Sequence, residues 1–217
     1  WNATFILILF TYLHHLYMDF VQPLSMQYAG QISSYLSAIP ATAITMFGVS
    51  VQLYHSKIRW GIIPLMFLLG MAGWAIGGFA ALVYSTIAVN KILHNTLWVP
   101  AYFHTYTLMG IVLFILGFLF YLFPAKNNKQ EHKLAKAGFW IFVTGSVGFL
   151  LMLYLGGLSS IPSSYARYTG MGIVSMHARA VDLSQVSVAF IILLLIGLSI
   201  MYFFLLAKLR RKPGDVN

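Results

Sequence analysis

Long apolar stretches separated by short polar connections run through this chain. The stretches cover residues 1–15, 32–54, 60–90, 97–123, 137–157 and 181–208. About twenty apolar residues cross a bilayer as a helix, and a backbone exposed to lipid must satisfy its own hydrogen bonds. Only 8% of the residues are charged and 60% are hydrophobic, whereas about a quarter of a soluble domain is charged. We therefore predict an all-α membrane protein, with about six transmembrane helices in a single transmembrane domain spanning residues 1–217.

Basic residues are confined to the connections and are divided unequally between the two sides of the membrane. One set of connections carries Lys57, Arg59, Lys126, Lys129, Lys133, Lys136, Lys208, Arg210, Arg211 and Lys212, and the other carries Lys91, Arg167 and Arg179. Positive charge accumulates on the cytoplasmic side of membrane proteins. The asymmetry predicts a cytoplasmic C-terminus, and it explains the net charge of +9 without any nucleic-acid partner.

The first apolar stretch is too short for a complete span and begins at Trp1 rather than at an initiator methionine. A signal peptide is a poor alternative, because the stretch has no basic start and no small-residue cleavage site before His14. We therefore expect it to be the end of a helix that begins upstream, in a longer protein.

Two groups of histidines stand out in this apolar background. His14 and His15 are adjacent at the end of the first stretch, and a second string runs His94-Asn-Thr-Leu-Trp-Val-Pro-Ala-Tyr-Phe-His104. Imidazole is a strong ligand for copper and heme iron, and histidines inside membranes are costly without a metal, a partner or water. Because the chain has no cysteine, any metal must bind through His, Tyr, Met or carboxylate groups. The pattern predicts a redox-metal membrane protein.

Helix geometry places these ligands in one half of the bilayer but on different faces. Tyr102 and His104 lie roughly 12 and 15 Å deeper than His94, and their side chains project about 200° apart. One helix could therefore present ligands to two cofactors. Simpler readings stay open: a hydrated helix end for the His pair, a hydrogen-bonded core residue for His104, and packing rather than iron ligation for Tyr102.

Other residues have ordinary explanations. His55, His132 and His177 are expected in solvated connections. Aromatic residues such as Trp74, Phe79 and Tyr84 are taken as core or lipid-facing packing.

The combined motifs resemble subunit I of the heme-copper oxidases, most closely the B-type (ba-type) branch. The resemblance rests on His14-His-Leu-Tyr17, on Ile39-Pro40, on the string from His94 to His104, and on Ile161-Pro-Ser-Ser-Tyr165. It covers the whole chain as helices seven to twelve of a twelve-helix fold. Nitric oxide reductases, a related alternative, share the His pair but lack the HNTxWVP string.

The resemblance implies a role for each matching residue. His14 and His15 would be two of three copper ligands, and His104 an axial ligand of the low-spin heme. His94 and Asn95 would lie near the heme propionates. The third copper ligand and the second low-spin heme ligand would come from upstream helices.

The resemblance also implies the activity of the intact protein. It would reduce dioxygen to water at a high-spin heme facing copper and couple this to proton translocation, in a prokaryotic plasma membrane. A subunit II would carry the electron entry site, with a cytochrome c, a small copper protein or quinol as donor.

At three places the sequence departs from the family pattern, and these departures argue against full oxidase activity. Tyr102 stands where the family has the histidine that binds the high-spin heme iron. Ser163 and Ser164 replace two arginines that hold propionates, and the proton-path positions offer Thr42 and Thr45 in another register. Two alternatives therefore remain: a degenerate, non-catalytic subunit, and an unrelated transporter whose histidines relay protons.

Overall fold

The computed structural model describes residues 2–19, 21–123, 129–164 and 173–209. Some residues named in the sequence analysis lie outside the described part of the chain: Tyr165, Lys126, Arg167, Arg210, Arg211 and Lys212. The side chains of Lys129 and His132 are also not described. The elements are α1 (Asn2–Thr11), the 3-10 helix η1 (Tyr12–Leu16), α2 (Leu24–His55), α3 (Ile62–Ser85), α4 (Ile87–Leu93), α5 (Trp98–His104), the π-helix η2 (Thr105–Val112), α6 (Leu113–Leu122), α7 (Lys129–Leu158) and α8 (Ile173–Leu209).

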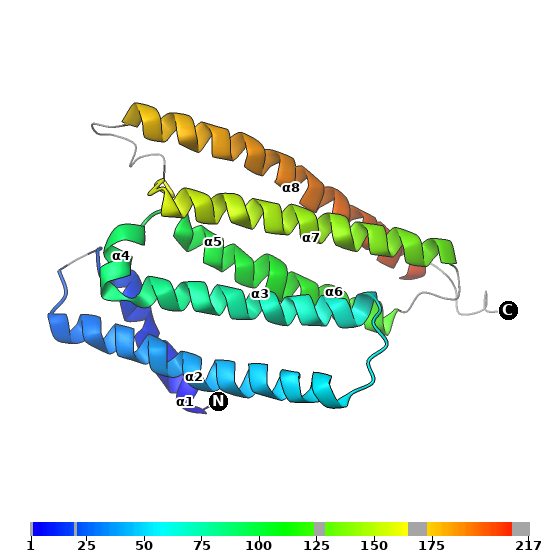
Figure 1. Cartoon of the computed structure of the whole chain (residues 1–217), viewed down its shortest axis with the longest axis horizontal. Coiled ribbons are helices and arrows are strands. Elements are labelled where there is room, and N and C mark those ends of the chain that lie inside the picture. The colour runs from blue at the N-terminus through cyan, green and yellow to red at the C-terminus, as the bar shows by residue number, and fades with distance from the viewer. Residues whose placement is uncertain (1, 20, 124–128, 165–172, 210–217) are drawn as a thin grey trace.

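The prediction of an all-α membrane protein is confirmed, with a small difference in the number of spans. Five helical segments in the described part are long and apolar enough to cross a bilayer: Leu24–His55, Ile62–Ser85, Trp98–Leu122, Lys133–Leu158 and Met176–Lys208. The predicted first span is a shorter apolar helix, Asn2–Leu16. These segments run roughly alongside one another, with α1 crossing α2 at one end (Figure 1).

The stretch 60–90, predicted as one helix, is broken at Thr86. That residue is extended (φ −69°, ψ 123°), so α3 ends at Ser85 and the short α4 begins at Ile87. Side chains from α2 hold the break: the Gln31 Oε1 atom accepts a hydrogen bond from the Ile87 backbone N (2.9 Å), and the Tyr35 and Thr86 hydroxyls are 2.6 Å apart. Hydropathy alone does not show this break, because apolar residues lie on both sides of Ser85 and Thr86.

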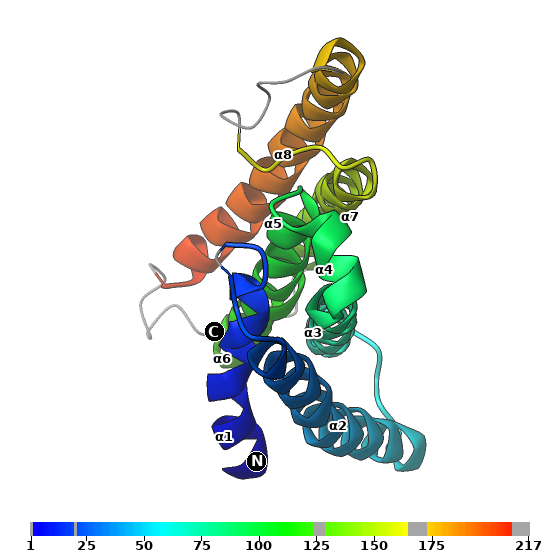
Figure 2. The same ribbon diagram turned by 90° about the vertical axis from the view of Figure 1, so that its left-hand side faces the viewer.

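Glycines allow the helices to approach one another closely, as in many membrane bundles. A Cβ at Gly145 of α7 would clash with the Leu194 backbone of α8, and one at Gly197 would clash with the Phe142 backbone. Likewise, Gly73 of α3 faces the Met109 backbone of η2. Figure 2 shows α7 and α8 crossing side by side, with α3 next to the α5–α6 segment and α2 at the periphery.

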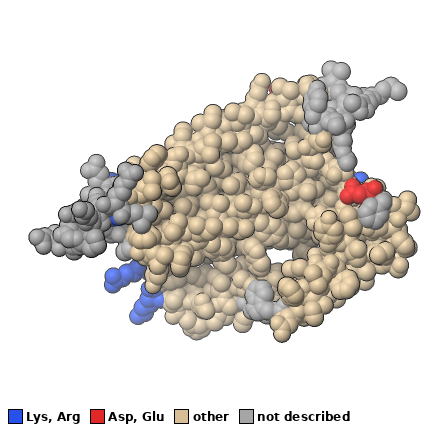
Figure 3. All heavy atoms as spheres, turned by 180° about the vertical axis from the view of Figure 1, so that it is seen from behind, with Lys and Arg blue, Asp and Glu red and all other residues tan. Residues whose placement is uncertain are grey.

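Charged side chains of the described residues gather toward the two ends of the bundle on the face shown in Figure 3. In the face shown in Figure 3, Lys and Arg side chains gather mainly at one end and acidic side chains at the other. The connection between α2 and α3, with Lys57 and Arg59, lies at the same end as the C-terminus of α6 and the start of α7 (Figure 1). This arrangement agrees with the grouping of basic connections made from the sequence.

Candidate functional site

The adjacent histidines lie in η1, the tight turn that ends the first apolar helix. Their ring centroids are 4.3 Å apart, and α2 approaches them closely because a Cβ at Gly30 would come within 2.9 Å of Leu13. His14 is buried, with its Nδ1 atom 3.0 Å from the Ser34 Oγ atom. The Ser34 hydroxyl donates its only proton to the Gly30 carbonyl oxygen (2.7 Å). His14 Nδ1–H must therefore be the donor to Ser34.

This tautomer leaves the lone pair of His14 on Nε2. That atom is buried and has no hydrogen-bond partner, a situation that is costly unless a metal or water completes it. The donor set and its tautomer therefore suit copper, with His15 beside it. Among the described residues, no cluster of three or more His, Cys, Asp or Glu side chains is present. The third ligand would have to come from another segment.

Tyr84, at the end of α3, makes aromatic contacts with both histidines and with Tyr102. Its ring centroid lies 5.7 Å from that of His14, 5.9 Å from that of His15 and 5.6 Å from that of Tyr102. Only 1% of Tyr84 is exposed. Among the described residues, the Tyr102 ring makes no direct contact with the ring of His14 or His15. Tyr84 therefore connects Tyr102 to the histidine pair.

His94 is held from two sides. Its Nε2 atom lies 3.0 Å from the Asp19 Oδ1 atom, and its Nδ1 atom lies 3.0 Å from the Tyr84 hydroxyl. Because a carboxylate can only accept, Nε2 carries the proton, and in the neutral ring Nδ1 accepts from the Tyr84 O–H. Asn90 adds a second link, since its Nδ2 atom donates to the carbonyl oxygens of His14 and Tyr84, both at 3.1 Å.

Asn95 and Ser163 cover one end of this region. Asn95 adopts a left-handed conformation (φ 58°), and its carbonyl oxygen accepts hydrogen bonds from the Ser163 backbone N (2.8 Å) and hydroxyl (3.0 Å). An isolated bridge between Thr96 and Pro162 fixes the same contact. The segment after α7 therefore folds back onto the HNT string.

Tyr102 and His104 make their closest aromatic contacts with different residues. Tyr102 is buried against Tyr84 of α3, whereas the His104 ring lies 5.8 Å from that of Phe149 on α7. The His104 Nδ1 atom donates to the Pro100 carbonyl oxygen at 2.7 Å, because a carbonyl can only accept. The Nε2 lone pair is thus left for a ligand, which is the usual preparation of a metal-binding histidine. The π-helix η2 begins at the next residue, and such helices are frequent at functional sites.

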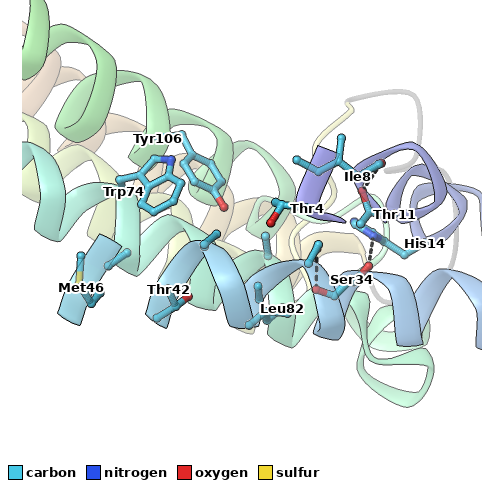
Figure 4. Close-up of a pocket in the computed structure, with 16 residues that line it drawn as sticks. Thr4, Ile8, Thr11, His14, Ser34, Thr42, Met46, Trp74, Leu82 and Tyr106 are labelled. Carbon is cyan, nitrogen blue, oxygen red and sulfur yellow. Dashed lines mark hydrogen bonds between the residues drawn. The ribbon is translucent and has the colours of Figure 1, made fainter. Parts of the chain in front are cut away.

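A cavity of about 250 Å³ lies between α1, α2, α3 and η2. Figure 4 shows His14 and Ser34 at one end of it and Trp74 and Tyr106 at the other. Small residues, including Gly78 and Ala81, form much of the remaining wall.

Comparison with known proteins identifies the family. A sequence model described as cytochrome c and quinol oxidase polypeptide I matches residues 1–193. The chain belongs to this family. It is 31% identical over 160 residues to cytochrome c oxidase polypeptide 1 of Halobacterium salinarum, covering 71% of this chain and 26% of that protein. It is 29% identical over 99 residues to cytochrome c oxidase subunit 1 of Thermus thermophilus, covering 44% and 18% respectively.

A solved structure shows the same fold. The cryo-EM structure of a heme-copper terminal oxidase dimer superposes with a TM-score of 0.71 at 21% identity, covering 92% of this chain and 39% of that chain. This oxidase-family chain spans about a quarter of the length of its Halobacterium relative. The family is therefore confirmed, and the B-type branch stays a prediction.

Heme and copper are implied by the oxidase family, and the described residues fit them unequally. His104 suits an axial ligand of one heme, and His14 with His15 suits copper. A second heme held by Tyr102 and facing that copper does not fit this arrangement. It would need the space between Tyr102 and the histidines, where the Tyr84 ring lies.

The sequence did not single out Ser34, Tyr84, Asn90 or Asp19. For Tyr84 the sequence predicts only ordinary packing. A signal for Asp19 was present, because it is one of only four acidic residues and lies five positions after His14. Ser34, Tyr84 and Asn90 had no comparable signal, since their roles depend on how α2, α3 and α4 meet.

Proposed function

We propose that this chain is the heme- and copper-binding membrane part of a terminal-oxidase-type redox complex. His104 would hold a low-spin heme, and His14 and His15 would hold copper. A subunit II would carry the electron entry site of the complex, with a cytochrome c, a small copper protein or quinol as donor. The complex lies in a prokaryotic plasma membrane with the C-terminus of this chain in the cytoplasm.

The hydrogen bond from His104 Nδ1 to the Pro100 carbonyl oxygen carries this proposal. It fixes the imidazole orientation and directs the Nε2 lone pair away from its own helix. When bound, the heme supplies one-electron chemistry, and the protein contributes the ligand, its orientation and a low-dielectric surrounding. The Phe149 ring packs nearly perpendicular to the same imidazole and limits its rotation.

The copper assignment is supported by the buried, unpartnered Nε2 atom of His14. Ser34 holds the opposite ring nitrogen and is itself anchored on Gly30. The ligand is thereby oriented before any metal binds, which raises metal affinity. His15 is close enough to join the same coordination sphere once a third ligand is supplied.

A second candidate is the complete terminal-oxidase reaction, the reduction of dioxygen to water coupled to proton translocation. The family match and the oxidase names of the relatives favour it. Tyr102 and the position of Tyr84 argue against it, since both affect the place where the oxygen-reducing heme would bind.

Optical spectroscopy combined with metal analysis tests the proposal on the intact complex containing the full-length protein. We expect a low-spin heme spectrum and copper in the same preparation. A complex that contains neither heme nor copper would favour a transporter with proton-relaying histidines, and would refute the proposal.

A further inference from the structure

The space between Tyr102 and the copper-type histidines is filled by a side chain that is firmly held. Tyr84 is fixed by three kinds of contact: its ring packs on Tyr102 and both histidines, its hydroxyl bonds to His94, and its backbone carbonyl oxygen accepts from Asn90. At 1% exposure, Tyr84 has little room for another rotamer. Displacing it would leave buried polar atoms of the group unpaired, which is costly.

The neighbouring wall is also occupied. Gly77 and Gly78 of α3 carry no side chain, so this part of the helix surface could come close to the face of a macrocycle. The Tyr106 ring instead lies on this surface, since a Cβ at Gly77 would come within 3.2 Å of it. The cavity lined by His14 and Tyr106 measures about 250 Å³, below the range of roughly 300–1,000 Å³ typical of pockets for cofactors and similar ligands.

The outer side offers little to the propionates of a second heme. His94, expected near them, has one ring nitrogen bonded to Tyr84 and the other to Asp19. Ser163 stands at the position of a family arginine, and its hydroxyl and backbone N are both turned to the Asn95 carbonyl oxygen. The described groups that would meet the propionates are thus engaged with one another.

We infer that Tyr84 closes the second heme position, so that this chain takes one heme and copper, and the copper faces a phenol ring in place of an iron. The inference rests on the proposed function. It makes Tyr84 a determinant of cofactor content: its side-chain volume excludes the macrocycle, and Tyr102 alone does not decide whether a second heme binds.

The test is the molar ratio of heme and copper to chain, measured on the full-length protein in its complex. Four versions are compared: the unchanged protein, Tyr102→His, Tyr102→His with Tyr84→Phe, and Tyr102→His with Tyr84→Ala. The phenylalanine version is the matched control, because it keeps the ring and loses only the hydroxyl. The low-spin heme spectrum reports in every sample whether the fold is retained.

We expect one heme per chain in the first three versions and two in the Tyr84→Ala combination. A second heme in the unchanged protein or in Tyr102→His would show that Tyr84 does not close the second heme position. The proposed function would be unaffected by that result. A Tyr84→Ala combination that keeps its low-spin heme without gaining a second one would also overturn it. If the alanine version does not fold, the heme-to-chain ratios of the unchanged protein and of Tyr102→His still test the closure, because both keep Tyr84. Absence of any heme from the unchanged protein would refute the proposed function as well.

Discussion

The hydroxyl of Tyr84 donates to the Nδ1 atom of His94 at 3.0 Å, and the two rings are nearly parallel, with an interplanar angle of 10°. These residues lie on either side of the break at Thr86, so the bond joins the end of α3 to the start of the HNT string. Asp19, on the far side of His94, extends the connection to the segment that carries His14 and His15. The bond therefore links both histidine motifs recognised in the sequence.

Tyr84→Phe should lower stability by about 1 kcal/mol, the usual net value of one buried hydrogen bond. The ring contacts with His14, His15 and Tyr102 should persist, because the ring is unchanged. The measurement is unfolding of the purified protein in detergent, followed by the helical signal. Tyr121→Phe is the control, since Tyr121 is 67% exposed and should show no change. Equal effects of the two substitutions would mean that the Tyr84–His94 bond contributes nothing.

His14→Ala and His104→Ala should have opposite effects on cofactor content. His14→Ala removes a copper ligand, so copper should fall to near zero while the low-spin heme remains. His104→Ala removes a heme ligand on the face toward α7, so the low-spin signal should be lost while copper is retained. Metal analysis and optical spectra of the full-length protein measure both. Loss of heme with retention of copper in His14→Ala would show that the two cofactors are assigned to the wrong residues.

Cysteine labelling in intact cells tests the orientation, and the chain is suited to it because it has no native cysteine. Ser56, between α2 and α3, and Lys91, in α4, are exposed and lie at opposite ends of the bundle. A reagent that cannot cross the membrane should label Lys91→Cys from outside and should reach Ser56→Cys only after the cells are opened. The reverse pattern would place the C-terminus outside, against the asymmetry of basic residues.

Much of the fold was predictable, because length and apolarity determine which segments can span a bilayer. The segment 97–123 corresponds to the continuous Trp98–Leu122 span. The histidine motifs were also visible, since histidines are conspicuous in so apolar a chain. Residue spacing was sufficient to predict that Tyr102 and His104 contact different neighbours, because helix geometry fixes that relationship locally.

Other features depend on contacts between distant segments and could not be read from spacing. The break at Thr86 is held by Gln31 and Tyr35 of α2, more than fifty residues earlier in the chain. The position of Tyr84 follows from that break and from Asn90. The sequence shows that Tyr102 replaces the family histidine. It does not show that the Tyr84 side chain fills the space beyond Tyr102.

Binding of carbon monoxide to the reduced, full-length protein tests the central claim most directly. A low-spin heme with both axial positions taken does not bind this ligand, whereas an iron with a free position facing copper does. With Tyr84 and Tyr102 in place, we predict no change in the reduced heme spectrum when carbon monoxide is added. A carbon monoxide-bound heme in the unchanged protein would show that a second heme binds here, and would contradict the account.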